Sequence, residues 1–374
     1  MAEGFITRRG GVSSEQALAP TITFVSKTDS QIVFTIKNND DATAVILWEL
    51  DDATPDANSL ELAADTTSSN ITVTGLDDDT EFIVYATANV TGKVKSNVSQ
   101  LSITTDETPT FIDATGGTTT TYTSGGKFYK SHTFTSGGNF VVNSLSNQSA
   151  LNEVDYLIIA GGGGGGIGGG GAGGYRTTNG TSGGNSSAES KVAVTAQTYG
   201  ITIGGGGNGS TSESSFQGFQ GNNSVALGIT STGGGSGGGS VSDRTTRNGG
   251  SGGGSRNASG ETGLGGFGIA GQGSNGGSQG ADGRSGGGGG AGQAGSDFDI
   301  GGDGLANLLR TGSNETRAGG GGGFNSGTGG SGGGGDSTEN GVVNTGGGGG
   351  GSGAGTGANG GSGIVIIRYE VGGL

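Results

Sequence analysis

The chain has 374 residues, of which 95 are Gly, 3 are Pro and none is Cys. This composition excludes collagen, which needs a Gly-X-Y repeat rich in Pro, and it excludes disulfides and thiolate chemistry. The net charge of −15 makes nucleic acid and anionic membranes unfavourable partners.

The N-terminal segment 1–19 is polar apart from Phe5 and Ile6. We predict a docking arm that orders on a partner, with Phe5, Ile6, Arg8 and Arg9 at the contact. The alternative is a frayed terminus without a role. The segment lacks an apolar stretch of signal-peptide length, and the chain has no run of about 18 apolar residues, so we expect no membrane insertion.

Residues 20–106 are predicted to form a β-sandwich. Apolar and polar residues alternate in short segments that are separated by Asn, Asp and Gly turns. Six or seven such strands in about 85 residues match the size of a two-sheet sandwich. The segments are 22–24, 31–36, 44–48, 70–73, 81–86 and 100–103.

The second half of this segment resembles a fibronectin type III domain. The resemblance rests on residues 74–89, Thr-Gly-Leu-Asp-Asp-Asp-Thr-Glu-Phe-Ile-Val-Tyr-Ala-Thr-Ala-Asn, followed by Gly92 and the closing strand 101–105. Phe82 stands where that family usually carries a Tyr that ties the corner to the backbone. Domains of this family mostly act as spacers, so the resemblance implies a spacer, with a binding role for its loops as the alternative.

Residues 107–160 are predicted to be a further β-region. The pattern places strands at 128–134 and 139–142, and it indicates a hairpin turn between them at Ser136-Gly137-Gly138. At its end, residues 154–160 form a nearly continuous apolar segment that runs directly into the first Gly tract.

A second apolar segment, 364–369, lies at the far end of the Gly-rich stretch and opens the closing strand 364–374. Both segments are nearly continuously apolar, which is typical of strands that are buried on both faces. We therefore expect 154–160 and 364–369 to pair side by side as a clasp that fastens the two ends of the stretch.

Most of the glycine lies in residues 161–363. Ordering this backbone costs about 1–2 kcal/mol per residue, and few side chains are present to offset the cost by burial. Because Gly has no Cβ, tracts in the left-handed polyproline II conformation can hydrogen-bond to neighbours on several sides. We therefore predict a fold that is all-β plus polyglycine II with no significant α-helix; the alternative is a flexible Gly/Ser linker.

The segments between the Gly tracts are predicted to be loops at the ends of this lattice. Exposed aromatic and Arg side chains are favoured at recognition surfaces. The alternative is that the aromatic side chains cover the lattice flank. The candidate receptor-binding residues are Phe216, Phe219, Arg244, Arg247, Phe298, Leu308 and Arg310.

No catalytic residue, cofactor or metal site is predicted. Repeated Gly satisfies dinucleotide fingerprints by chance, and the Gly-Lys-Phe run at 126–128 lacks the Ser or Thr of a phosphate loop. The only imidazole, His132, occupies an ordinary strand position. Acidic runs such as 51–52 and 77–79 fit solvated turns; they offer oxygen ligands to Ca²⁺, but no spacing enforces binding. Sugar cleavage by paired carboxylates is the remaining enzymatic alternative.

The Gly-rich region resembles the glycine-rich domains of marine phage tail proteins at both of its ends, residues 154–176 and 359–369. The alternation of Gly tracts with inserts is similar to the receptor-binding tip adhesins of T-even phages. These resemblances imply an extracellular virion protein of the tail that binds other tail proteins through its arm and a host surface protein or glycan through its loops, without turnover. The alternative is a structural subunit of a filament that binds copies of itself.

Overall fold

The computed structural model describes residues 14–211, 216–239, 245–256, 263–280 and 284–373. The chain divides into two compact units, Met1–Thr108 and Pro109–Leu374. The fold is all-β, and its helical content is limited to short 3₁₀ turns such as η1 (Ser149–Leu151) and η2 (Thr245–Arg247). None of the described helical segments has the length and apolar character needed to cross a membrane.

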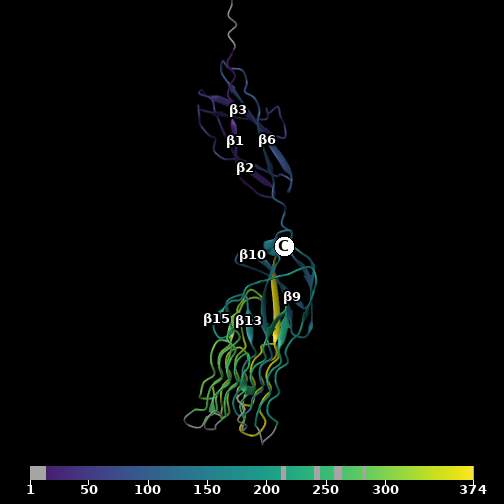
Figure 1. Cartoon of the computed structure of the whole chain (residues 1–374), viewed down its shortest axis with the longest axis vertical. Coiled ribbons are helices and arrows are strands. Elements are labelled where there is room, and N and C mark those ends of the chain that lie inside the picture. Colours follow the sequence, from purple (N-terminus) through teal and green to yellow (C-terminus); the bar gives the residue numbers. More distant parts are fainter. Residues whose placement is uncertain (1–13, 212–215, 240–244, 257–262, 281–283, 374) are drawn as a thin grey trace, which may run out of the picture. The chain divides into compact units, whose positions relative to one another are not determined.

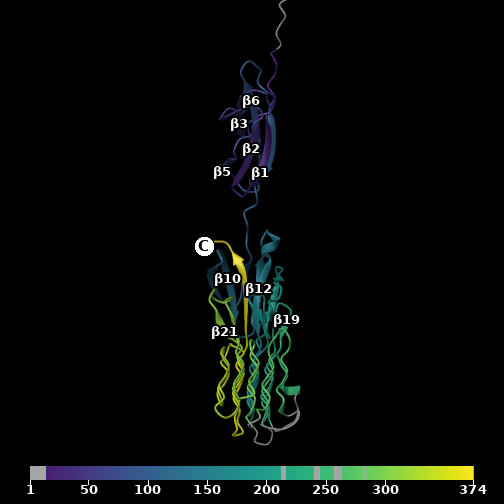
Figure 2. The ribbon, with the colours of Figure 1, turned by 90° about the vertical axis from the view of Figure 1, so that its left-hand side faces the viewer.

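The first unit is a sandwich of two antiparallel sheets (Figures 1 and 2). One sheet has the order β1-β2-β5 and the other the order β4-β3-β6-β7. The six strands that the alternation predicts are confirmed. The unit has a seventh strand, β4, which the alternation did not predict. The strands are β1 (Thr21–Lys27), β2 (Gln31–Lys37), β3 (Ala44–Leu50), β4 (Asn58–Leu62), β5 (Ile71–Thr74), β6 (Glu81–Val90) and β7 (Ser99–Thr104).

The inward faces of these strands form one apolar core. Phe34 and Ile46 are fully buried in it, and the ring of Trp48 meets Phe34 edge-on at a centroid distance of 5.3 Å. Ala17 belongs to the same core, and its backbone N–H donates to Val94 O at 2.8 Å. The end of the predicted arm is therefore built into the first unit.

The second unit contains a six-stranded sheet with the order β13-β12-β22-β10-β9, in which β16 also pairs with β12. A three-stranded sheet, β17-β11-β8, packs beside it, and the unit also contains three two-stranded hairpins and the Gly tracts. Its strands are β8 (Asp113–Thr115), β9 (Thr118–Ser124), β10 (Lys127–Phe134), β11 (Gly138–Ser144), β12 (Glu153–Ile159), β13 (Tyr175–Thr177), β14 (Thr181–Ser182), β15 (Ser186–Ser187), β16 (Val192–Ala193), β17 (Thr198–Ile201), β18 (Ser224–Ala226), β19 (Ile229–Ser231), β20 (Leu305–Asn307), β21 (Glu315–Arg317) and β22 (Ile364–Val371).

The hairpin predicted at Ser136-Gly137-Gly138 is wrong. Strand β10 pairs with β9 on one side and with β22 on the other, so neither edge is open to β11. Strand β11 instead pairs with β8 and β17. The turn therefore carries the chain from one sheet to the other instead of joining two paired strands.

The predicted clasp is confirmed. Strands β12 and β22 pair antiparallel from Asp155 opposite Arg368 to Ile159 opposite Ile364. One face of the pair is buried in a core with Phe134 and Phe140, and the other face in a core that includes lattice residues such as Ala172. Because both faces are covered, the two ends of the Gly-rich region are fixed side by side.

His132 is fully buried in the first of these cores. Its Nδ1 donates to Gly116 O at 2.7 Å, and its Nε2 accepts from the Tyr369 hydroxyl at 3.1 Å. The ring meets Phe140 edge-on and stacks on Tyr369. Burial lowers the pKa of His132 below its ordinary value, so the folded protein holds this ring neutral.

We expect the second unit to lose stability as the pH falls below about 6.5. There the unfolded chain protonates His132 while the folded chain keeps it neutral, so the free energy of unfolding falls by up to about 1.4 kcal/mol per pH unit until the folded pKa is reached. Urea unfolding between pH 7.5 and 5 measures this slope. Because this is the only His, His132→Gln removes the slope; equal slopes in both proteins contradict the prediction.

The Gly tracts form a lattice in which the backbone repeats every three residues. The central tract, 161–166, follows β12, and its successive N–H groups point to three neighbours in turn. The N–H groups of Gly161 and Gly164 donate to the carbonyls of residues 222 and 219. Those of Gly162 and Gly165 donate to the carbonyls of residues 361 and 358. Those of Gly163 and Gly166 donate to the carbonyls of residues 171 and 168. These three neighbours run antiparallel to the central tract, because the acceptor numbers fall as the donor numbers rise.

The carbonyl groups of the same tract follow the same period. The carbonyls of Gly161 and Gly164 accept from the N–H groups of residues 234 and 237. Those of Gly162 and Gly165 accept from residues 207 and 210. Those of Gly163 and Gly166 accept from residues 349 and 352. These three neighbours run parallel to it. The central tract therefore has six hydrogen-bonded neighbours and a threefold repeat, which is the polyglycine II arrangement. The tracts run side by side in Figures 1 and 2.

Candidate binding surfaces

The lattice fixes the backbone of a set of turns at its end away from the clasp. We call these turns, together with the half of each tract that leads into them, the turn end. Ile167 forms the turn between tracts 161–166 and 168–174, and its carbonyl accepts from Phe324 N at 3.0 Å. Phe324 N also donates to Ser285 Oγ, which donates to Asp299 Oδ1 at 2.8 Å. Turns from distant parts of the sequence are thus hydrogen-bonded to one another.

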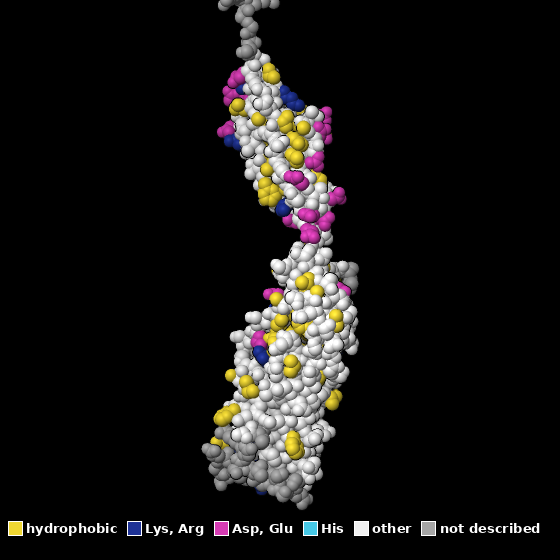
Figure 3. Space-filling model, turned by 45° about the vertical axis from the view of Figure 1, so that its right-hand side comes forward, with side chains coloured by type: hydrophobic (Ala, Val, Ile, Leu, Met, Phe, Trp, Pro, Cys, Tyr) yellow, Lys and Arg dark blue, Asp and Glu magenta, His cyan; other side chains and the backbone are white. Residues whose placement is uncertain are grey.

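Several large apolar side chains are exposed at this end. Phe219 is 60% exposed, Phe298 54%, Ile300 51% and Phe324 43%. Their backbones are held by the lattice: Phe219 O accepts from Gly164 N, and Ser296 N donates to Ile300 O. Yellow side chains are scattered over the surface of the Gly-rich region in Figure 3. The turn end thus presents apolar side chains on fixed backbone.

Phe216 is half-buried at the same end, and its backbone has a positive φ of 47°. The guanidinium carbon of Arg256 lies 5.9 Å from the centroid of its ring, within the range of a cation–π contact. Sequence reasoning missed Arg256, because nothing in the spacing of the two residues indicates that their turns meet.

Arg247 was predicted to face a receptor, but the structure buries its side chain. It lies in η2 and is only 1% exposed, so it is packed inside the lattice, where its carbonyl accepts from Gly253 N at 2.7 Å. Arg244 lies outside the described residues, as do the four predicted docking residues Phe5, Ile6, Arg8 and Arg9.

The remaining two candidates lie at the opposite end, beside the clasp. Leu308 is half-buried, and Leu309 next to it is fully buried against the clasp strands. The Tyr122 hydroxyl donates to Leu309 O at 2.7 Å, and Ser131 Oγ donates to Arg310 O at 2.9 Å. The structure therefore separates the candidate residues into a turn-end group and a clasp-end group.

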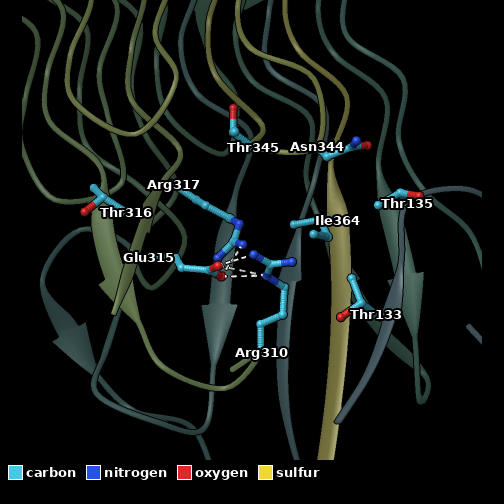
Figure 4. A pocket seen from close by; sticks show the side chains of 9 residues that line it. All are labelled: Thr133, Thr135, Arg310, Glu315, Thr316, Arg317, Asn344, Thr345 and Ile364. Carbon is cyan, nitrogen blue, oxygen red and sulfur yellow. Dashed lines mark hydrogen bonds and ion pairs between the residues drawn. The ribbon is translucent and has the colours of Figure 1, made fainter. Parts of the chain in front are cut away.

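Arg310 borders a cavity of about 340 Å³ at the clasp end (Figure 4). Glu315 accepts hydrogen bonds from Nε and Nη2 of Arg310 and from Nη2 of Arg317. These bonds, chiefly those from Arg310, lower the pKa of Glu315 to about 2, so it is ionised at neutral pH. The cavity is lined by Thr133, Thr135, Arg310, Glu315, Thr316, Arg317, Asn344, Thr345 and Ile364.

Sequence reasoning missed Glu315 and Arg317 as partners of Arg310. A signal was present: in Glu315-Thr316-Arg317 the two charges are two residues apart, so they share one face of strand β21. Among the described residues, no group of three or more His, Cys, Asp or Glu side chains is arranged to hold a metal ion.

The family model described as "Glycine-rich domain" matches residues 135–370 of the chain. The match begins just before β11 and ends within β22, so it spans the clasp and the whole lattice. None of the curated proteins matches the chain.

Proposed function

The chain belongs to the glycine-rich domain family, and we propose that it is a tail protein of a phage virion that binds a host surface through the turn end of its lattice. The proposal makes it an extracellular adhesin that acts by binding and not as an enzyme. The receptor is a host surface protein or glycan, and the arm at 1–19 binds other tail proteins.

The observation that carries this proposal is that apolar side chains are exposed at the turn end on backbone that the lattice has already ordered. Association costs free energy whenever it immobilises loops and side chains, so a preordered surface binds more tightly than a mobile one. Phe219 and Phe298, each more than half exposed, supply large contact areas with few rotatable bonds.

We propose that the first unit is a fibronectin type III-like spacer. Its seven strands and its division into sheets of three and four strands are in keeping with that family. Trp48 on β3 packs across the core on Phe34, as a buried Trp does in related sandwiches. A rigid spacer holds a binding domain away from the particle that carries it.

We expect the double variant Phe219→Ser, Phe298→Ser to lose most of its adsorption to host cells. Truncation of exposed anchor residues typically costs about 2 kcal/mol or more each at the centre of an interface, which corresponds to a fall in affinity of more than tenfold. Binding of the labelled full chain to whole cells measures the effect.

The matched control is Phe267→Ser. Phe267 is also 52% exposed, but it lies on the flank beside the clasp end, where its carbonyl accepts from Gly249 N. Unchanged adsorption of the double variant, or an equal loss in the control, contradicts the proposal. A purified chain that polymerises alone and does not adsorb to cells favours the filament subunit instead, and sugar release from host polysaccharide favours an enzyme.

A further inference from the structure

The clasp-end cavity contains several hydrogen-bond donors that the fold itself does not use. The hydroxyl groups of Thr133 and Thr135 make no hydrogen bond to any described residue, and neither does Nδ2 of Asn344. Figure 4 shows Thr133, Thr135 and Asn344 across the gap from the two guanidinium groups. The cavity wall therefore offers donors from several separate segments.

The two arginines add further free donors. Arg310 bonds to Glu315 through its Nε and Nη2, which leaves Nη1 available. Nη1 of Arg317 is buried and has no acceptor within the described part of the chain, although the residue is only 7% exposed. A buried donor without a partner costs free energy, and an acceptor on a ligand would recover it.

The charge of the cavity limits the kind of ligand. Arg310 and Arg317 carry two positive charges and ionised Glu315 carries one negative charge, so one positive charge remains. A single carboxylate balances this charge, whereas a phosphate monoester, with nearly two negative charges, exceeds it. Guanidinium groups also match the planar geometry of a carboxylate.

The size and polarity of the cavity limit the ligand further. A volume of about 340 Å³ is at the lower end of the range of about 300–1,000 Å³ for small-molecule sites. Two unused Thr hydroxyls and an Asn amide suit a polyhydroxylated molecule, and Ile364 supplies the only aliphatic side chain of the lining. Such a combination matches one sugar ring that carries an acid group.

We propose that the clasp-end cavity binds a sugar that bears one carboxylate, such as a uronic acid unit of a polysaccharide. The carboxylate lies against Arg310 beside Glu315, and the sugar hydroxyls receive hydrogen bonds from the Thr and Asn side chains. This site is separate from the turn end, so it gives the chain a second binding surface that does not depend on the proposed function.

The test is calorimetric titration of the full chain with glucuronate and with glucose, which differ only in the acid group. Glucuronate is expected to bind at least tenfold more tightly than glucose. Arg310→Gln is expected to weaken glucuronate binding by about tenfold to a hundredfold, the range for a lost hydrogen bond to a charged group. Thr135→Val leaves the ion network intact and is expected to weaken binding severalfold.

Lys37→Gln is the matched control, since it removes one positive charge from an exposed ion pair in the first unit and is expected to leave binding unchanged. Thermal unfolding verifies that each variant is folded, and Thr135→Val keeps the test decisive if Arg310→Gln is not. The proposal is overturned if glucuronate does not bind, if glucose binds equally well, or if Thr135→Val has no effect. Equally tight binding of inorganic phosphate or glucose 6-phosphate also overturns it, because the site is then a general anion site.

Discussion

Gly170→Ala is expected to unfold the lattice of the second unit, with a loss of about 3 kcal/mol or more in the free energy of unfolding. An added Cβ would lie 2.7 Å from the carbonyl carbon of Gly163 and closer still to its oxygen. The backbone cannot move away, because Gly170 N donates to Gly349 O and Gly170 O accepts from Gly321 N. One methyl group therefore disturbs three neighbouring tracts at once.

Hydrogen–deuterium exchange over residues 161–174, together with thermal unfolding, measures this effect. The control is Gly205→Ala in an outer tract, where the residue is exposed and the nearest atom to a new Cβ is Nδ2 of Asn222 at 3.6 Å. That variant is expected to be as stable as the wild type or more stable by up to about 1 kcal/mol, because Ala restricts the unfolded chain. Slow exchange in both variants would falsify the close-packed lattice.

Asp155→Asn is expected to lower the free energy of unfolding by about 3–5 kcal/mol, because it leaves a buried guanidinium without its counter-charge. Asp155 Oδ2 accepts from Arg368 Nη2 at 2.7 Å, and the two side chains are only 4% and 6% exposed. The guanidinium of Arg368 lies over the ring of Tyr129 at 4.2 Å. The pair lies in the clasp, so its loss weakens the fastening of both ends of the lattice.

The double variant Asp155→Asn, Arg368→Met is expected to recover much of this stability, because it removes the uncompensated charge as well. Glu370→Gln is the surface control: Glu370 pairs with Lys127, which is half exposed, and its replacement is expected to cost less than about 1 kcal/mol. Chemical denaturation of the four proteins compares these values. If the double variant is no more stable than Asp155→Asn, burial of the charge is not the cause of the loss.

The sequence predicted those parts of the fold that depend on local pattern or composition. Alternation identified β2 and β6, and the apolar runs at 154–160 and 364–369 identified the clasp. The hairpin at Ser136-Gly137-Gly138 failed because turn residues show where a chain reverses, not which strand occupies the neighbouring edge. That edge of β10 is taken by β22, from the opposite end of the unit's sequence.

The binding surfaces were less predictable than the fold. Residue type correctly suggested exposure for Phe219 and Phe298, but the same reasoning placed the buried Arg247 beside them. In a threefold backbone, the side of the tract that a residue faces depends on its phase relative to all six neighbours, and no short motif records that phase. The Arg256 contact with Phe216 is likewise set by the lattice and not by spacing along the chain.

The sideways direction of the amide groups in the Gly tracts has a mechanical consequence. The central tract is joined laterally to its six neighbours by hydrogen bonds that point in successive directions around its axis. A pulling force along that axis loads these bonds in shear, so many must break together before one tract slides past another. Because each bond contributes about 1 kcal/mol net, a bundle of them resists tension far better than a chain whose bonds open one at a time.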